Sequence, residues 1–208
     1  MICLILATRN AHKVAEIRGI LGGNIHLFSQ LDFPGAPAVV EDADTFAGNA
    51  TKKAEGLAAW LAANGRRTDY VLADDSGLEV DALGGAPGVH SARFAADDAG
   101  GTANSSDADN NAKLLRLLQG APPERRAARF RCVLALAGQD KPTRLFEGHC
   151  EGRIARVHAG AGGFGYDPLF VPEGFTQSFA ELGEEVKNKI SHRARALAEL
   201  RRFQDGVK

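Results

Sequence analysis

The feature that most constrains the fold is an apolar run at the N-terminus that leads directly into an amphipathic segment. Residues 2–7 are apolar without interruption, and Asn10 follows three positions later. A strand buried on both faces is apolar throughout, and such strands occur where helices cover both sides of a sheet. Asn10 can cap a helix that buries Val14, Ile17 and Leu21 and ends at the next two glycines. The chain therefore begins with a predicted buried strand and covering helix.

Strand-like and helix-like segments continue along the chain, and the strands cluster in its second half. The pattern predicts strands over 25–28, 71–73, 78–82, 129–136 and 144–157, helices over 45–64, 108–118 and 191–203, turns over 84–88 and 139–142, and loops over 95–107 and 159–168. Alternation followed by clustering favours an α/β fold with a mixed sheet. A length of 208 residues predicts a single domain.

Composition argues against several classes of partner. The formal net charge of -1 supplies no basic field, so we expect no nucleic-acid partner. No apolar run approaches the ~20 residues that a membrane span needs, and we expect no membrane contact. The three cysteines contain no CxxC pair, which favours packed thiols in a reducing compartment and a cytoplasmic location.

The first segment with chemical potential is Thr8-Arg-Asn-Ala-His-Lys13, where the predicted strand passes into the helix. Unpaired N–H groups at a helix start attract anions, and Thr8, Asn10 and Lys13 add donors and charge. A plain helix cap with surface charges explains the same residues, and spacing alone does not decide between the two.

The second segment is acidic and precedes the helix over 45–64. Glu41, Asp42 and Asp44 come before the helix, and Lys52 and Lys53 lie within it. Acids at a helix start are favourable whatever the function, because they complement the helix dipole. A metal or phosphate role is the alternative.

Asp74 and Asp75 follow an apolar strand directly and precede Ser76-Gly77. Two buried carboxylates repel each other unless a cation lies nearby, and Mg²⁺ prefers oxygen ligands of this kind. Successive side chains on a strand point to opposite faces, so we expect only one of the pair to face a ligand directly. A solvated turn is the alternative.

Residues 160–168 contain a literal GxGxxG, but an Asp-Pro and an apolar run follow it instead of a helix, which excludes a dinucleotide fold. The glycines allow a ligand to approach the backbone, and Phe164 and Tyr166 could stack on a base. Basic residues Lys187, His192 and Arg193 lie near a helix start capped by Ser191. A structural turn and a solvated basic surface are the respective alternatives.

Taken together, these segments resemble the non-canonical purine nucleoside triphosphate pyrophosphatases, the inosine/xanthosine triphosphatase family. The matching pieces run in order from about residue 2 to residue 203: Thr8-x-Asn10-x-x-Lys13, Thr45-Phe46-x-x-Asn49-Ala50-x-x-Lys53, Ala73-Asp-Asp-Ser-Gly-Leu-x-Val80, Gly85-Ala-Pro-Gly-Val-His-Ser-Ala-Arg93, Gly163-Phe-Gly-Tyr-Asp-Pro168 and Ser191-His-Arg193. The chain departs from the family's usual pattern at His90, Phe94 and Ser178, which we interpret as variation in local packing.

The resemblance implies a two-lobed α/β fold with a long central mixed β-sheet flanked by helices and an active-site cleft between the lobes. It implies a homodimer that uses Mg²⁺ to hydrolyse ITP, dITP and XTP to the nucleoside monophosphate and pyrophosphate, which removes deaminated purines from the nucleotide pool. By matching positions, Asp75 would be the catalytic base and a metal ligand, and Glu41 and Asp74 would be further metal ligands. The implied substrate-binding residues are Thr8, Arg9, Asn10, Ala11, His12, Lys13, Lys53, Ser76, Phe164, Gly165, Tyr166, Asp167, Lys187, His192 and Arg193.

Two other functions fit the same segments. One is a pyrophosphatase for other modified nucleotides, and the other is a nucleotide-binding sensor without turnover. The acidic residues argue against a sensor, because binding alone does not need so many carboxylates near phosphate.

Overall fold

A computed structural model describes residues 3–23, 25–66, 68, 70–96, 103–138 and 141–206. The described residues form two compact units. Unit 1 comprises those of Met1–Asp75, Cys132–Gly148 and Arg193–Lys208, and unit 2 comprises those of Ser76–Arg131 and His149–His192.

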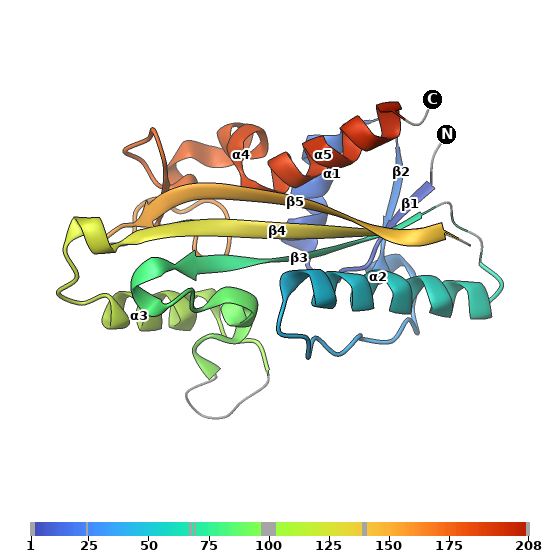
Figure 1. The fold of residues 1–208 in the computed structure, drawn as a ribbon, viewed down its shortest axis with the longest axis horizontal. Helices are drawn as coiled ribbons and strands as arrows, with labels where there is room; N and C mark the ends of the chain where they lie inside the picture. The colour runs from blue at the N-terminus through green and yellow to red at the C-terminus, as the bar shows by residue number, and fades with distance from the viewer. Residues whose placement is uncertain are drawn as a thin grey trace. The chain divides into compact units, whose positions relative to one another are not determined.

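Five helices and six strands carry the fold (Figure 1). The helices are α1 (Ala11–Leu21), α2 (Phe46–Ala63), α3 (Asp107–Leu117), α4 (Phe179–Ile190) and α5 (His192–Gly206). The strands are β1 (Cys3–Leu6), β2 (His26–Ser29), β3 (Tyr70–Val80), β4 (Ala127–Gly138), β5 (Lys141–Ile154) and β6 (Phe170–Pro172), in the order β2-β1-β3-β4-β5-β6. Strand β1 is parallel to β2 and β3, whereas β5 and β6 are antiparallel. The predicted α/β fold with a mixed sheet is confirmed.

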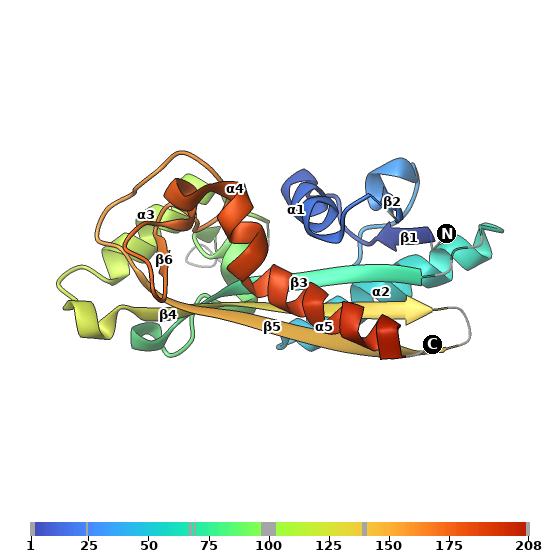
Figure 2. The ribbon, with the colours of Figure 1, turned by 90° about the horizontal axis from the view of Figure 1, so that it is seen from above.

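In unit 1, helices cover both faces of the strands, as the apolar run at the N-terminus predicts. Figure 1 shows α1 and α5 on one side of these strands and α2 on the other. Leu4 and Leu6 point from β1 into a core shared with Ile17 of α1 and Leu197 of α5. Helix α5 lies along the first part of β5 in both ribbon views (Figure 2), where Phe203 packs on Phe146 with 5.7 Å between ring centroids.

In unit 2, an aromatic cluster forms the centre of the core. The ring of Phe130 in β4 lies 4.7 Å from that of Phe170 in β6, and Phe170 lies 5.3 Å from Phe179 at the start of α4. The imidazole of His192 stacks on Phe130 at 4.7 Å with 15° between the planes. Leu114 of α3 joins the same core and is fully buried.

The capping residues in the sequence predict the positions of α1 and α2 closely. Asn10 caps α1, and its side chain accepts hydrogen bonds from two backbone N–H groups, while Gly22 ends the helix. The side chain of Thr45 caps α2 by accepting from the N–H of Gly48, and the helix buries Ala50, Ala54, Leu57 and Leu61 along one face. No helix in the described ranges is both long enough and apolar enough to span a membrane.

Two sequence-based expectations for the fold are wrong. The strands expected over 71–73 and 78–82 are one continuous strand, β3, so Asp74 and Asp75 lie inside a strand and not in a turn. Helix α4 was not expected, although Ser178 and Glu181 form a capping box at its start. Gly183 (φ 77°) interrupts the helical backbone of α4, and this break obscures the apolar periodicity.

Two further expectations fall partly on residues outside the described ranges. Of the turn expected over 139–142, Lys141 and Pro142 belong to β5, while residues 139–140 are not described. Of the loop expected over 95–107, residues 97–102 are not described, and Asp107 begins α3. The Gly-rich segment of 159–168 lies between β5 and β6 and contains no helix, as predicted.

Candidate functional site

The start of α1 places the predicted phosphate segment on the surface of unit 1. The side chain of Asn10 accepts hydrogen bonds from the backbone N–H groups of His12 (2.9 Å) and Lys13 (3.1 Å). Thr8 Oγ1 accepts one from the N–H of Asn10 at 3.1 Å, and the Arg9 guanidinium donates to the carbonyl of Ala36 at 2.5 Å. Asn10 is therefore both the helix cap and a fixed part of the segment predicted to bind phosphate.

Alternation along β3 sends Asp74 towards the α1 and α5 side of the strand. Asp74 is 2% exposed, and its carboxylate lies 2.6 Å from Lys13 Nζ and 2.8 Å from Arg193 Nε. The Cys132 thiol also donates to this carboxylate at 3.2 Å. Arg193 pairs with a second carboxylate, that of Glu16 in α1. Two acids and two cations thus form a buried network that joins α1, β3 and α5.

The pKa of Asp74 follows from these neighbours. Burial alone would raise the pKa, but the positive charges of Arg193 and Lys13 outweigh burial and hold the pKa well below its ordinary value. The pKa of Arg193 is raised in turn, because Asp74 and Glu16 outweigh the opposing effect of burial. Asp74 is therefore ionised, and its oxygens already accept hydrogen bonds from this network.

Asp75 points to the other side of β3, where it meets α2. Its Oδ1 lies 2.7 Å from Lys53 Nζ, and the same ammonium lies 3.0 Å from Glu41 Oε2. Asp75 Oδ2 is buried and accepts no hydrogen bond from the residues that the structure describes. Burial raises the pKa of Asp75 and the nearby Glu41 charge adds to this, which together exceed the opposing effects of Lys53 and Lys13. The Lys53 ammonium thus pairs with two carboxylates.

Asn49 explains how Glu41 reaches this position. Asn49 lies in the first turn of α2, is 1% exposed, and makes two hydrogen bonds to the backbone of Ala43, at 3.0 Å to its N–H and 3.2 Å to its carbonyl. The acidic segment is thereby held against α2. Lys52 pairs with Asp42 at 2.5 Å, but both side chains are exposed, and such a pair contributes little to stability.

The donor set of Asp75 and Glu41 fits Mg²⁺. Two carboxylates share one lysine, and a buried oxygen lacks a partner, so the cluster has room for a further positive charge. Among the described residues, no three His, Cys, Asp or Glu side chains converge on a common point. This is compatible with Mg²⁺, which proteins usually hold by one or two carboxylates while water and substrate phosphates complete the shell.

In unit 2, the Gly-rich segment brings Phe164, Asp167 and Lys187 together. The Asp167 carboxylate accepts hydrogen bonds from the backbone N–H of Phe164 at 2.9 Å and from Lys187 Nζ at 2.5 Å. Both charged residues are buried, at 1% and 3% exposure, and Lys187 Nζ lies 4.6 Å from the centroid of the Phe164 ring. Two of the predicted base-binding residues of this segment, Phe164 and Asp167, therefore form one cluster with the lysine.

The remaining predicted residues lie in different surroundings. Tyr166 is buried, and its hydroxyl donates to the carbonyl of Ser91 at 2.8 Å. His192 stacks on Phe130, and Ser76 is half-buried in β3. Arg193 belongs to unit 1 with Asp74, whereas Lys187 and Asp167 belong to unit 2.

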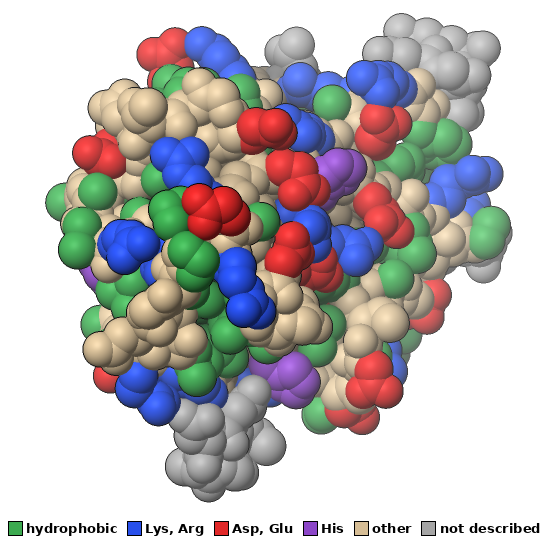
Figure 3. All heavy atoms as spheres, turned by 60° about the vertical axis from the view of Figure 1, so that its left-hand side comes forward, with side chains coloured by type: hydrophobic (Ala, Val, Ile, Leu, Met, Phe, Trp, Pro, Cys, Tyr) green, Lys and Arg blue, Asp and Glu red, His purple; other side chains and the backbone are tan. Residues whose placement is uncertain are grey.

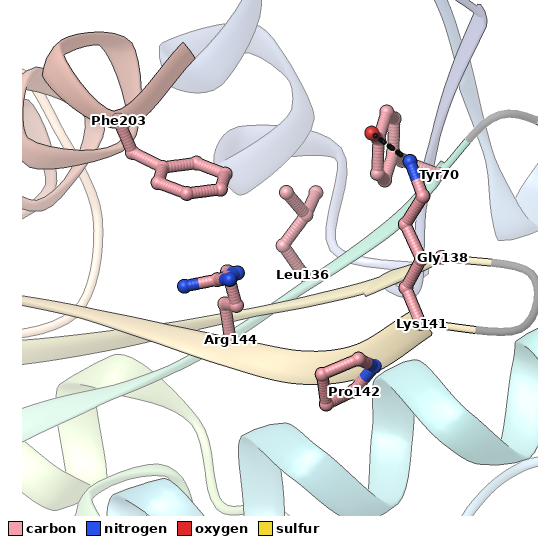
Figure 4. Close-up of a pocket in the computed structure, with 7 residues that line it drawn as sticks. All are labelled: Tyr70, Leu136, Gly138, Lys141, Pro142, Arg144 and Phe203. Carbon is pink, nitrogen blue, oxygen red and sulfur yellow. Dashed lines mark hydrogen bonds between the residues drawn. The ribbon is translucent and has the colours of Figure 1, made fainter. Parts of the chain in front are cut away.

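A pocket and a charged surface lie outside these clusters. A pocket of about 230 Å³ is lined by Tyr70, Leu136, Gly138, Lys141, Pro142, Arg144 and Phe203 (Figure 4), and none of these is a predicted site residue. On the face in Figure 3, acidic and basic side chains of the described residues are interspersed.

The model of the Ham1 family matches residues 4–203 of this chain. The chain belongs to the Ham1 family. Proteins named dITP/XTP pyrophosphatase are similar to it, for example those of Geobacillus kaustophilus (50% identity over 95% of this chain and 91% of that protein) and Desulforamulus reducens (52% identity over 93% and 91%). The solved structure of the Staphylococcus aureus Ham1 protein has a TM-score of 0.83 at 36% identity and covers 99% of this chain and all of that one. The resemblance recognised in the sequence is confirmed.

For this Ham1 family member, sequence reasoning missed Glu16. Glu16 is 8% exposed and pairs with Arg193, although it occupies a helix position beside the buried Ile17. An acid next to the apolar stripe of α1 was the available signal. Its partner, however, lies 177 positions away in the sequence, so no local pattern could identify the pair.

Proposed function

We propose that this chain hydrolyses dITP, XTP and ITP to the nucleoside monophosphate and pyrophosphate. The observation that carries the proposal is the identity of 50–52% to proteins named dITP/XTP pyrophosphatase over more than nine tenths of both chains. The cluster of Asp75, Glu41 and Lys53 supports a hydrolytic enzyme over a sensor, because a carboxylate with a raised pKa and an unpaired oxygen suits a general base. In this proposal residues 1–208 act as one pyrophosphatase domain.

Asp75 would accept the proton of the attacking water. The water oxygen forms a bond to the α-phosphorus, the bond from that phosphorus to the bridging oxygen breaks, and pyrophosphate leaves with the bridging oxygen. A positioned general base contributes about 10²–10⁴ in rate. Lys53, held between Asp75 and Glu41, would stabilise charge on the phosphate oxygens.

The phosphates would lie at the start of α1, where Thr8 to Lys13 supply backbone and side-chain donors. A helix N-terminus favours anions because its first N–H groups lack helical partners and its dipole is positive there. Lys13 bridges to Asp74 and so links the phosphate segment to β3. Arg9 and His12 are exposed beside it and would add positive charge and donors.

Lys187 and Asp167 would recognise the purine edge together with Phe164, Gly165, Tyr166, Ser76 and His192. Arg193, whose guanidinium pairs with Asp74 and Glu16, stays a predicted substrate-binding residue. Hypoxanthine and xanthine present a 6-keto acceptor and an N1–H donor, and a lysine ammonium can donate to the keto oxygen. Adenine reverses this donor and acceptor pattern, so a site built for the keto edge would leave polar groups unpaired. Such mismatches can reject the wrong substrate by about 10⁴-fold.

Magnesium belongs to the proposal as the metal that Asp75 and Glu41 would hold. When bound, it would neutralise charge on the phosphate oxygens. Asp74 stays a weaker candidate, because Arg193, Lys13 and Cys132 already occupy its oxygens. The homodimer, the cytoplasmic location and the cleft between lobes that the resemblance implies remain predictions, and sedimentation velocity would test the dimer.

A pyrophosphate-release assay with ITP, dITP, XTP, ATP and GTP, in Mg²⁺ or in EDTA, tests the proposal. We expect turnover of the first three nucleotides that EDTA abolishes, and little turnover of ATP and GTP. Equal turnover of ATP and ITP would remove the proposed specificity. Activity confined to other modified nucleotides, or ITP binding without product, would favour the two alternative functions instead.

A further inference from the structure

The two peptide groups that flank the Cα atom of Gly165 are held by one face of α3. The Gly165 N–H donates to Asp107 Oδ2 at 2.6 Å, and the Gly165 carbonyl accepts from Asn111 Nδ2 at 2.9 Å. Asp107 and Asn111 are four positions apart on the helix, so their side chains lie on the same face. The two residues therefore act as a clamp on the two successive peptide groups that meet at Gly165.

Gly165 lies at the centre of the segment that the proposed function assigns to the base. Gly163 and Gly165 both have positive φ (75° and 63°), a backbone region that residues with side chains rarely adopt. Flexible glycines lose much conformational freedom when ordered, so a loop with two of them needs external contacts to keep one shape. Asp167 supplies such a contact within the segment, through its bond to the Phe164 N–H.

The contact from α3 differs in kind from the contact with Asp167. Asp167 also pairs with Lys187 and so belongs to the predicted recognition cluster, whereas Asp107 and Asn111 are not predicted to touch substrate. Asn111 is 2% exposed, which fixes its amide, and Asp107 lies at the start of α3, where a negative charge is favourable. The clamp is therefore built on a rigid element outside the loop.

A second contact from the same helix supports this role. Asn110 accepts from the N–H of Ala95 at 2.8 Å and donates to the carbonyl of Ala92 at 3.3 Å. Ala92 follows Ser91, whose carbonyl accepts from the Tyr166 hydroxyl. The first turns of α3 thus hold the Gly165 backbone directly and the contact partner of Tyr166 indirectly.

We propose that Asp107 and Asn111 are positioning residues for the purine base, because they hold the backbone on both sides of Gly165 in the conformation that base binding requires. The proposal rests on the proposed function. If the clamp is lost, the loop samples other conformations and only a fraction of molecules can bind the base. Apparent affinity then falls by that fraction, while the rate of a correctly bound complex is unchanged.

Asp107→Ala is the test variant and Asp109→Ala its matched control. Both acids are exposed in the first turn of α3, and both substitutions remove one negative charge there, but Asp109 contacts Ser106 and not the loop. Steady-state kinetics with ITP would be measured for each variant, together with inhibition by inorganic tripolyphosphate, which has no base. Hydrogen exchange of the Gly165 amide would report on the clamp itself.

For Asp107→Ala we expect KM for ITP to rise about three- to tenfold, the factor that one net hydrogen bond contributes. We expect kcat to stay within about twofold, because only binding changes. Tripolyphosphate inhibition should be unchanged, and exchange at Gly165 should be faster. Asp109→Ala should match the wild type in all of these measurements.

Two results would overturn the proposal while leaving the proposed function intact. One is equal kinetics for the two variants in a wild type that is active on ITP. The other is an equal loss of ITP and tripolyphosphate binding in Asp107→Ala, which would indicate a general structural defect. A wild type that releases no pyrophosphate from ITP would instead overturn the proposed function, and this inference with it. Asn111→Ala should give the same KM effect at a temperature below its measured melting midpoint, and an unchanged KM there would also count against the clamp.

Discussion

Asp74 and Asp75 are adjacent residues of one strand, and the two sides of β3 give them opposite surroundings. Asp74 meets the cations Lys13 and Arg193, and Arg193 also pairs with Glu16, so two positive charges balance two negative ones. On the other side, the Lys53 ammonium pairs with the carboxylates of both Asp75 and Glu41, so one directly paired cation is shared between two negative charges, and the positive charge of Lys13 adds to its attraction.

The difference separates a structural role from a chemical one. The pKa of Asp74 is lowered although burial opposes this, whereas the pKa of Asp75 is raised by burial and by the Glu41 charge in spite of Lys53. A satisfied carboxylate stabilises the fold, and an unsatisfied one can accept a proton or a cation. The comparison teaches that the packing partners of a strand face, and not the residue type, decide what each aspartate does.

Asp75→Asn should produce the largest change in activity. The amide keeps the size of the side chain but cannot accept the proton of water, so we expect kcat for ITP to fall by about 10²–10⁴. Pyrophosphate release under saturating ITP measures kcat, and calorimetric titration with ITP should still show binding. Near-normal turnover would show that Asp75 is not the general base. The proposed chemical difference between Asp75 and Asp74 would then be lost.

Asp74→Asn should produce the largest change in stability. The substitution leaves the buried guanidinium of Arg193 with one carboxylate in place of two, and breaking a buried ion pair costs about 3–5 kcal/mol of unfolding free energy. Urea denaturation of Asp74→Asn and Asp75→Asn in parallel measures the difference. Similar losses in both variants would contradict the structural role that we assign to Asp74 alone.

Much of the local structure was predictable, because its determinants are close in sequence. Asn10 and Gly22 mark the ends of α1 within a few residues of the groups that they cap. By contrast, helix α4 was missed because Gly183 breaks its periodicity, even though Ser178 and Glu181 form a capping box. Propensity and capping act over one or two turns, and a backbone kink between them hides the pattern.

The different partners of Asp74 and Asp75 could be predicted only in part. Strand alternation predicts that the pair separates, but not which side carries which partner. The partner of Asp74 is Arg193, 119 positions later, and that of Asp75 is Lys53, 22 positions earlier. The contacts of Gly165 with Asp107 and Asn111 span 58 and 54 positions. Such pairings depend on the packing of whole elements, which local patterns do not specify.

Acid should weaken the wild type partly through Asp74. Its folded pKa is lowered, so its stabilising contribution is present above the unfolded value of about 3.9 and is lost as pH falls through the folded pKa. Urea midpoints from about pH 5 downwards would show this loss in the wild type. The urea midpoint should fall less steeply with decreasing pH in Asp74→Asn, which has no such carboxylate to protonate. An equal fall of the urea midpoint with decreasing pH in both proteins would show that other acids dominate the response.

Mg²⁺ should stabilise the wild type through the Asp75 side of β3, and this is the smallest effect. A ligand that binds only the folded state adds about 1.4 kcal/mol at ten times its dissociation constant. Thermal melting without nucleotide, in EDTA and with increasing Mg²⁺, measures this shift independently of turnover. Asp75→Asn removes a proposed ligand and balances Lys53 against Glu41 alone, so its melting temperature should hardly respond to Mg²⁺. A response equal to that of the wild type would place the metal elsewhere, and the Asp75 side of β3 would then lose its proposed role in binding Mg²⁺.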